Sequence, residues 1–298
     1  METFIEGLDS LALTGDKALV SMSDRASGEF LTIIKKAKKA TQKELTRLTN
    51  RLLLTTDPEG IESDILKVRH SLEQIEILQK KLIVNSGMKW SAIVFPRIQK
   101  LGLKDFNKFE KLVGLPLSGF GKIDELQLRV ASESWRGMLG KFTDDNKKYL
   151  SSMLTEHIMS GVGTKKSLIK KITDTVSPSS PLRGGRVKNF VNAELARINR
   201  ESSAVRMQEY NHFRFSGPVD TKTEDICLRN VGFIRTKSAW LAIKSDIFSY
   251  GLHYGCRHKL YPVKKSFLKT DAERNAFDNS TRVLHSKKDR EFISKALR

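Results

Sequence analysis

The chain has 298 residues, 53 of them Lys or Arg and 34 Asp or Glu, so that its net charge is +19. Such a charge attracts polyanions, which include nucleic acid, an anionic membrane face and an acidic protein. The presence of only two cysteines excludes a disulfide scaffold. The first residues lack the features of a secretory signal, and no apolar run approaches the roughly 18 residues that span a bilayer. We therefore expect a soluble protein made in a cytoplasm.

The excess of positive charge lies in the second half of the chain. Residues 161–298 hold 28 basic and 13 acidic side chains, whereas residues 1–160 hold 25 and 21. We expect residues 161–298 to contact a polyanion, and binding to duplex DNA should be independent of sequence and weaken steeply with salt. The candidate nucleic-acid contacts are Lys165, Lys166, Lys170, Lys171, Arg183, Arg186, Lys259, Lys264 and Lys265.

The first half of the chain has the apolar spacing of long helices. Apolar residues recur at three- and four-residue steps over residues 31–52 and again over residues 61–82, from Ile61 and Ile65 to Leu82. Between the two stretches, Asp57 is a good N-cap and Pro58 suits the first helical position. The pattern predicts an antiparallel helical hairpin that turns near Asp57-Pro58. We favour a seam that packs on its own partner helix over a coiled coil between subunits.

The remaining stretches complete a mainly α fold. Residues 86–121 are rich in Gly and Pro, which predicts short helices broken by turns, and helical spacing resumes over 122–160 with Leu126 and Val130 among the core candidates. We expect a helical domain over residues 1–160 that contains the antiparallel hairpin.

The second half is expected to contain two further parts. A basic helical segment covers residues 161–212, with a Pro-, Gly- and Ser-rich linker near 177–186. A small α+β module covers residues 213–298, where aromatic residues and short apolar stretches become frequent, and we expect most of those aromatic rings in its core. The predicted architecture is therefore an N-terminal helical hairpin or bundle followed by a small C-terminal α+β module.

No motif for nucleotide binding or hydrolysis is complete. A phosphate-binding loop reads G-x-x-x-x-G-K-[ST]. Gly121-Lys122 comes nearest, but Pro116 stands at the first Gly position and Ile123 replaces Ser or Thr. The H-E-x-x-H and G-x-S-x-G patterns are absent from the sequence. We therefore expect a protein that is not an enzyme.

Four residues able to bind a transition metal lie in the segment from Asp220 to Val263. They are Cys227, His253, Cys256 and His258. The spacing of His253 and Cys256 suits a tight turn, and residues two apart share one face of an extended segment. Tetrahedral zinc accepts this mixture of donors, and a small module gains stability from such a site. Zinc is therefore the candidate cofactor.

Two other interpretations of these residues stay open. The cysteines can be small buried apolar side chains, with the histidines hydrogen-bonded in the core or at the surface and no metal bound. A catalytic thiol–imidazole pair of Cys256 and His258 is the third interpretation, although no orienting Asn or Asp and no Gly-rich pocket is evident beside it.

The cluster carries an expectation about geometry. We expect Cys227 and Cys256 to lie close together, with His253 or His258 within reach. Arg257 lies between two candidate ligands, so its side chain should point the other way. It should reach a carboxylate, such as that of Asp220 or Asp225, or solvent.

The same segment resembles the C-terminal signature of the phage Mu-type head-morphogenesis (minor head protein) family. That signature reads D-x-x-T-C-x-x-C, then a longer spacer, then H-x-x-C-R-C with a following proline and valine. The matching residues are Asp220, Thr223, Cys227, His253, Cys256, Arg257, Pro262 and Val263. Glu224 stands where the family often has its first Cys, and His258 where it often has its last, so a site of four cysteines cannot form here.

Weaker similarity extends upstream, so that the match covers roughly residues 155–265. Asn199-Arg200-Glu201 is similar to the R-T-E helix of the family, and Gly161-Val162-Gly163-Thr164 is similar to the turn that starts its preceding helix. The N-terminal half carries no family motif.

The resemblance implies a minor head protein of a tailed bacteriophage, located in the virion head interior and in the host cytoplasm during assembly. It would associate with the portal, and it would assist procapsid assembly and DNA packaging or delivery. The implied partners are the phage portal, capsid or scaffold proteins and double-stranded DNA, with no membrane in the assembled head. The alternatives are a cytoplasmic DNA-binding protein with a small metal-stabilised module, and a hydrolase or transferase that uses the Cys/His cluster.

Overall fold

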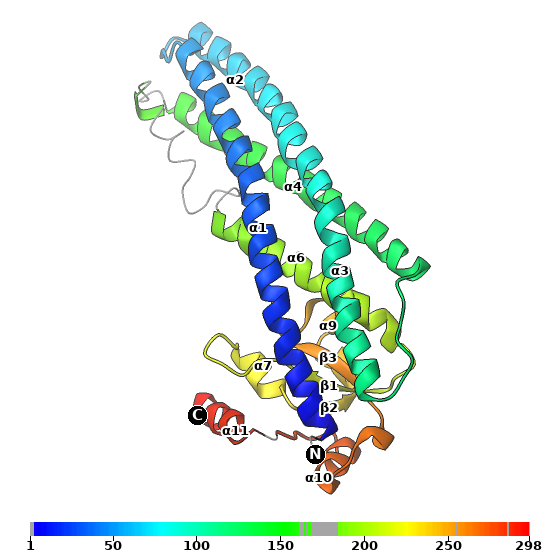
Figure 1. The fold of residues 1–298 in the computed structure, drawn as a ribbon. Helices are drawn as coiled ribbons and strands as arrows, with labels where there is room; N and C mark the ends of the chain where they lie inside the picture. Colours follow the sequence, from blue (N-terminus) through cyan, green and yellow to red (C-terminus); the bar gives the residue numbers. More distant parts are fainter. Residues whose placement is uncertain are drawn as a thin grey trace. The chain divides into compact units, whose positions relative to one another are not determined.

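The computed structural model describes residues 3–160, 164, 166–168, 184–253, 255–284 and 286–297. Long helices dominate the first part of the chain (Figure 1). They are α1 (Phe4–Arg51), α2 (Pro58–Gln79), α3 (Ser86–Leu112) and α4 (Lys122–Met159), with a π-helical stretch η1 (Lys80–Asn85) between α2 and α3, and they are followed by α6 (Gly184–Ala204) and the 3-10 turn η3 (Val205–Met207). None of the helices searched in the described residues is long and apolar enough to cross a membrane.

A small sheet and short helices follow. The strands are β1 (His212–Ser216), β2 (Ile234–Thr236) and β3 (Lys259–Val263); the helices are α7 (Asp225–Asn230), α8 (Lys237–Ile243), α9 (Ile247–Tyr250), α10 (Asp271–Asp278) and α11 (Lys287–Ala296), with the 3-10 turn η4 (Lys265–Phe267). The sheet order is β2-β1-β3 and both pairings are antiparallel. The predicted class, mainly α with a small α+β module near the C-terminus, is confirmed.

The chain forms two compact units, each built from separate segments. The signature unit consists of Met1–Arg25, Phe95–Arg129 and Val191–Arg298, and the hairpin unit consists of Ala26–Val94 and Val130–Phe190. These boundaries differ from the predicted divisions at residues 160 and 212. The reason is that α1, α3, α4 and α6 each contribute residues to both units, so a division along the sequence does not separate the two.

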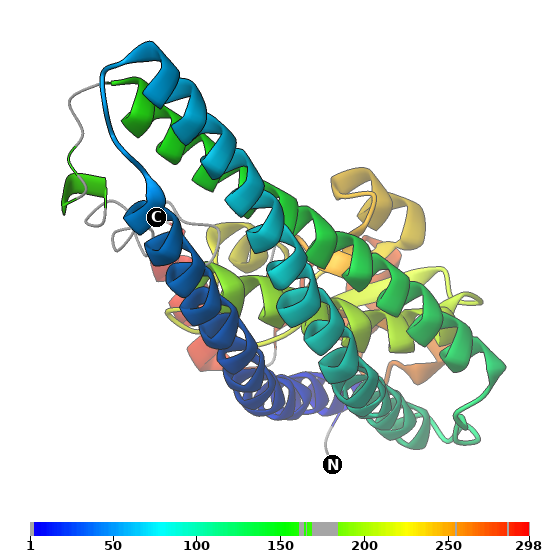
Figure 2. The same cartoon turned by 90° about the horizontal axis from the view of Figure 1, so that it is seen from above.

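The hairpin unit has the predicted antiparallel seam. Its core is formed by Leu45, Leu48 and Leu52 of α1, Val68, Leu72 and Ile75 of α2, and Leu150, Leu154 and Ile158 of α4. Figure 2 shows α2 and α4 side by side. At the turn, the Asp57 carboxylate accepts a hydrogen bond from the Gly60 N–H at 3.1 Å, and Pro58 is the first helical residue. The intramolecular seam and its turn are therefore confirmed.

The seam differs from the predicted pattern at two positions. Ile65 is 39% exposed, and at the end of the stretch Ile83 is buried whereas Leu82 is only half-buried. A π-helical turn accommodates one residue more than an α-helical turn, and η1 lies at this point. The buried position at the end of the stretch therefore shifts by one residue, from Leu82 to Ile83.

The prediction of short broken helices over 86–121 is wrong, because α3 continues to Leu112 and contains Pro96. Its glycines permit close packing rather than turns. A Cβ atom on Gly102 would collide with the Asn199 carbonyl and the Ser202 hydroxyl of α6. In α4, the core candidates Leu126 and Val130 are 56% and 55% exposed, so that part of the predicted core is wrong as well.

The core of the signature unit joins the start of α1 and the end of α3 to the sheet and its helices. Phe4, Ile5 and Leu8 of α1 and Phe106 and Phe109 of α3 share one cluster with the aromatic residues of the module. The aromatic side chains Phe213, Phe215 and Trp240 are fully buried there. The expectation that most aromatic rings form the core of the module is therefore confirmed for these residues.

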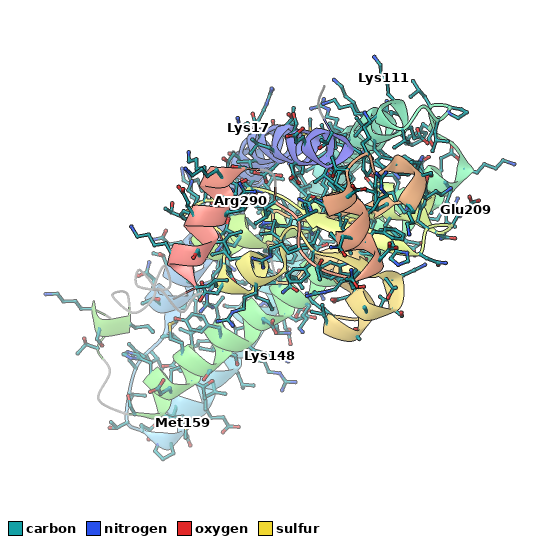
Figure 3. All side chains as sticks on the ribbon, turned by 90° about the horizontal axis from the view of Figure 1, so that it is seen from below. Lys17, Lys111, Lys148, Met159, Glu209 and Arg290 are labelled. Atoms are coloured by element: carbon teal, nitrogen blue, oxygen red, sulfur yellow. The ribbon has the colours of Figure 1, made fainter. Side chains whose placement is uncertain are left out.

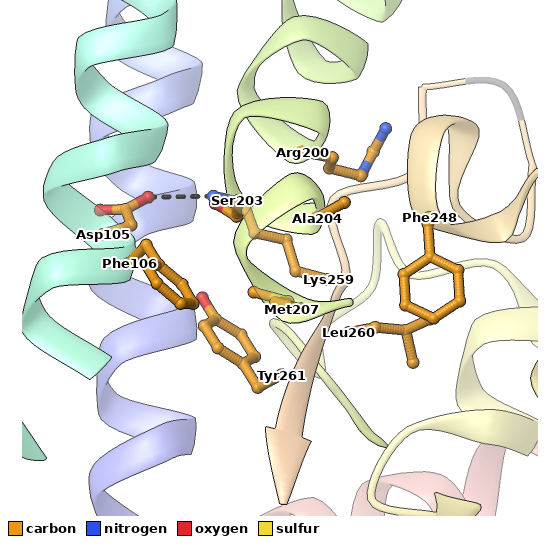
Figure 4. Close-up of a pocket in the computed structure, with 10 residues that line it drawn as sticks. All are labelled: Asp105, Phe106, Arg200, Ser203, Ala204, Met207, Phe248, Lys259, Leu260 and Tyr261. Atoms are coloured by element: carbon orange, nitrogen blue, oxygen red, sulfur yellow. Dashed lines mark hydrogen bonds and ion pairs between the residues drawn. The ribbon is translucent and has the colours of Figure 1, made fainter. Parts of the chain in front are cut away.

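A buried ion pair fixes α3 to the sheet. The Lys259 ammonium of β3 lies 2.9 Å from an Asp105 carboxylate oxygen of α3, and both side chains are buried (Figure 4). Burial lowers the pKa of Lys259, and the adjacent Asp105 charge opposes that shift. The pair lines a small pocket into which the Tyr261 ring also points.

Replacement of Leu72 and Ile75 by Asp should unfold the hairpin seam. Both side chains are buried, and two charges placed in an apolar core should lower the free energy of unfolding by about 4 kcal/mol or more. The matched control is Leu66→Asp with Ile77→Asp, two residues of α2 that are 59% and 61% exposed and should cost about 1 kcal/mol at most. Thermal unfolding followed by circular dichroism compares the two variants, and equal Tm values would place the seam elsewhere.

Candidate functional site

The Cys/His cluster is assembled from two segments of the signature unit. Cys227 is carried by α7, and His253, Cys256 and His258 lie on the connection from α9 to β3. The two sulfur atoms are 3.5 Å apart and both cysteines are buried. The predicted proximity of the two cysteines is therefore confirmed.

The connection needs a glycine at the point where it passes the cysteine. Gly251 ends α9 with a φ of 68°, a conformation that residues with a side chain rarely adopt. A Cβ atom at this position would lie 2.7 Å from Cys256 Cβ and 2.9 Å from its sulfur. Gly251 therefore allows the backbone to approach the cluster closely.

Three of the four candidate ligands form a group that can hold a metal ion. One ligand atom each of Cys227, His253 and Cys256 lies within 4.8 Å of the others. Two sulfurs that bind one tetrahedral zinc ion at about 2.3 Å are about 3.8 Å apart, which is close to the separation found here. The residues present therefore fit a zinc ion.

The fourth candidate, His258, differs from the expectation. Its Nδ1 atom is 3.9 Å from the Cys256 sulfur, but it does not belong to the group of three. The ring stacks on Phe215 with 5.0 Å between centroids and an angle of 10°. Its buried Nε2 atom has no hydrogen-bond partner among the described residues.

The pKa values of the two thiols shift in opposite directions. The hydrogen bond with Cys227 holds the pKa of Cys256 well below its usual value, and His253 and His258 act in the same direction. The same hydrogen bond, together with burial, raises the pKa of Cys227. A Cys227 thiol that donates to a Cys256 thiolate is consistent with both shifts. The thiolate is the form of cysteine that binds metals.

His253 is oriented by a carboxylate. Its Nδ1 atom lies 3.2 Å from a carboxylate oxygen of Glu224, the residue that precedes α7. Histidines bound to zinc are commonly held by a carboxylate at the ring nitrogen that does not bind the metal. Glu224, which replaces a cysteine of the resembled signature, therefore occupies a position suited to this supporting role.

Arg200 of α6 fixes the backbone of the connection. This side chain is buried, and its guanidinium donates to the carbonyl oxygens of Ser249 at 3.0 Å and His258 at 3.2 Å, and to that of Cys256. Burial lowers the pKa of Arg200, and the adjacent Cys256 opposes that shift most strongly. In the sequence, Arg200 appeared only within the weaker upstream similarity, and its contacts with the backbone of the cluster were not predicted. A lone arginine on a helix carries no local signal of such contacts.

Arg257 pairs with Asp220, as one of the predicted alternatives stated. Its Nη1 and Nη2 atoms lie 3.0 Å and 2.5 Å from the two carboxylate oxygens. Thr223 donates to the same carboxylate at 3.1 Å. The hydrogen bond from Arg257 lowers the pKa of Asp220 to about 2. Asp220, Thr223 and Arg257, three residues of the resembled signature, thus form one hydrogen-bonded group.

The candidate nucleic-acid contacts differ in their exposure in the structure. Lys165, Lys170, Lys171 and Arg183 lie outside the described residues, while Lys166, Arg186, Lys264 and Lys265 are exposed. Lys265 pairs with Asp278 at 2.8 Å, and the Lys264 ammonium lies 4.8 Å from the Tyr210 ring centre. The prediction for Lys259 is wrong, because this side chain is buried against Asp105 and phosphates cannot reach it.

Comparisons of the chain with family models, with curated proteins and with solved structures found no match. The function of the site is therefore inferred from its own residues and from the signature that they resemble.

Proposed function

We propose that the chain is a minor head protein of a tailed bacteriophage. It is a virion component without a catalytic step, it associates with the portal, and it assists procapsid assembly and DNA packaging or delivery. The observation that supports this proposal most is the convergence of the signature residues. Cys227, His253 and Cys256 form one donor group, and Arg257 with Asp220 fixes the connection that carries two of them.

Zinc is the metal that we assign to the cluster. Cys227, His253 and Cys256 would hold the ion, and Glu224 would support His253 from outside the group of ligands. Bound there, zinc would cross-link α7 to the segment before β3. The zinc ion would stabilise the fold of this small module, whose described residues form a sheet of three short strands.

The burial of the thiols favours a structural role over nucleophilic catalysis. Cys227 is fully buried and Cys256 is 1% exposed. A catalytic cysteine lies in a partly exposed environment that a substrate can enter. The interpretation as a hydrolase or transferase is therefore less favoured than a cluster that holds the fold together.

A second candidate function is a cytoplasmic DNA-binding protein with a metal-stabilised module. The net charge of +19 supports it as well, because that charge favours DNA inside a phage head and in a cell equally. The location of the protein separates the two candidates.

Purified virions test the proposed function. In particles isolated on a density gradient from the phage that encodes the chain, we expect mass spectrometry to detect the protein at low copy number. A protein inside the head should also resist nuclease treatment and high-salt washing of intact particles. A host DNA-binding protein, removed by the same washes, is the control for contamination. Detection in the soluble lysate alone would contradict the proposal and favour the cytoplasmic alternative.

Metal analysis tests the zinc assignment. We expect one zinc per chain, with X-ray absorption distances of about 2.3 Å to sulfur and about 2.0–2.1 Å to nitrogen. His253→Ala should lose metal affinity, whereas His70→Ala, which removes an exposed histidine of the hairpin unit, should not. Affinity should fall as the pH falls, because the ligands bind zinc only after they lose their protons. A parent protein that contains no metal, and whose Tm neither zinc nor a chelator changes, would contradict the assignment.

A further inference from the structure

One face of α3 carries a continuous row of cations. Arg97, Lys100, Lys104, Lys108 and Lys111 are exposed, and they follow each other at steps of three and four residues. At 3.6 residues per turn this spacing keeps them on one side of the helix, over a length of about 21 Å. Figure 3 shows Lys111, the last member of the row, projecting outward at the edge of the molecule. We call these five residues the basic row.

Nothing of opposite charge is exposed along this part of α3. Every exposed residue from Arg97 to Lys111 belongs to the basic row. The two acidic residues within the same stretch, Asp105 and Glu110, are buried. Asp105 pairs with Lys259, and Glu110 accepts hydrogen bonds from the Ser118 backbone and hydroxyl. No ion pair involves a member of the basic row in the part of the chain that the structure describes.

The opposite face of the helix fixes the direction in which the row points. Ile98, Phe106 and Phe109 are buried. The Asn199 amide of α6 donates to the Ile98 carbonyl at 3.4 Å, and the Ser203 hydroxyl donates to the Gly102 carbonyl at 3.2 Å. These contacts hold α3 in one rotation about its axis. The cations therefore lie on the side of α3 that faces away from these contacts.

We propose that the basic row binds the phosphate backbone of double-stranded DNA. A row of cations of one sign suits a duplex, in which each strand carries one phosphate per roughly 3.4 Å of helix axis. The row has no exposed aromatic ring on which the bases of a single strand would stack. Between Arg97 and Lys111 no apolar side chain that would enter a bilayer is exposed, and Leu112, 41% exposed, is the next residue of the helix. A surface of lysines and arginines alone suits duplex DNA, which such side chains contact at its phosphates.

The inference rests on the proposed contact with DNA and names a surface for it. The charge balance placed that contact in residues 161–298, because residues 1–160 are nearly neutral. That near neutrality is an average over the whole segment. Along α3 the acidic residues are buried and the basic residues are exposed, so the outer face of the helix is strongly positive.

Fluorescence anisotropy with a labelled duplex of mixed sequence tests the basic row in the full chain. The row variant replaces Arg97, Lys100, Lys104, Lys108 and Lys111 by Gln. The control variant replaces Lys35, Lys36, Lys39, Lys43 and Lys148 by Gln, five exposed lysines of the hairpin unit, and so removes the same charge. The slope of log affinity against log salt should become shallower by about 4 to 5 in the row variant and by about 1 or less in the control.

The outcomes separate this inference from the proposed function. A parent protein that does not bind DNA overturns both the proposed DNA contact and the basic row. A parent that binds, with a row variant of equal slope, overturns the basic row alone. Equal losses in both variants also overturn it, because binding would then depend on net charge and not on the row.

Two further measurements keep the test decisive. Lys104→Gln and Lys108→Gln as single changes should each reduce the slope by about one, which covers the case in which the fivefold variant does not fold. Vesicles of phosphatidylserine test a lipid partner, because the loop after the row exposes Leu117 at 63% and Phe120 at 42%. A row variant that loses vesicle binding and keeps DNA binding would overturn the proposal.

Discussion

One buried cation, Arg200, holds the backbone of the signature unit at the Cys/His cluster. Its guanidinium binds three backbone carbonyls of the segment that carries His253, Cys256 and His258. Hydrogen bonds from a charged donor contribute about 1.5–3 kcal/mol each, and a buried charge without partners is strongly destabilising. The planar fork of an arginine reaches several acceptors at once, whereas a lysine ammonium is a single point charge. The cation also stands beside the cysteine pair, and Cys256 opposes the lowering of the Arg200 pKa by burial.

The same dependence on distant partners explains why the chain does not divide along its sequence. Three cations of the C-terminal module are paired with carboxylates of the first half of the chain. These pairs are Arg214 with Asp9 at 2.9 Å, Lys259 with Asp105 at 2.9 Å, and Arg257 with Asp16 at 3.6 Å. Arg214 and Lys259 are buried, and removal of their partners would leave uncompensated charge in the core. The segments Met1–Arg25 and Phe95–Arg129 are thus integral parts of the signature unit.

Local patterns predicted the features that local physics determines. The hairpin turn followed from a capping Asp57 before Pro58, and the seam followed from the periodic apolar residues. The proximity of Cys227 and Cys256 followed from the resemblance and from the need for separate segments to meet. The sequence did not predict an unbroken α3. Gly102 lies in this helix because α6 packs closely against it there, and a contact with a distant helix leaves no local sequence pattern. The burial of Lys259 was missed for the same reason, since its partner is 154 residues away.

Hydrogen exchange of the Arg200→Gln variant tests the central claim most directly. The account predicts faster exchange of the backbone amides of residues 249–260 than in the parent, while amides of the hairpin unit keep their protection. Arg229→Gln removes an exposed arginine of the signature unit and should leave both regions unchanged. Protection of residues 249–260 that equals that of the parent would show that the segment holds its shape without Arg200, and would contradict the account.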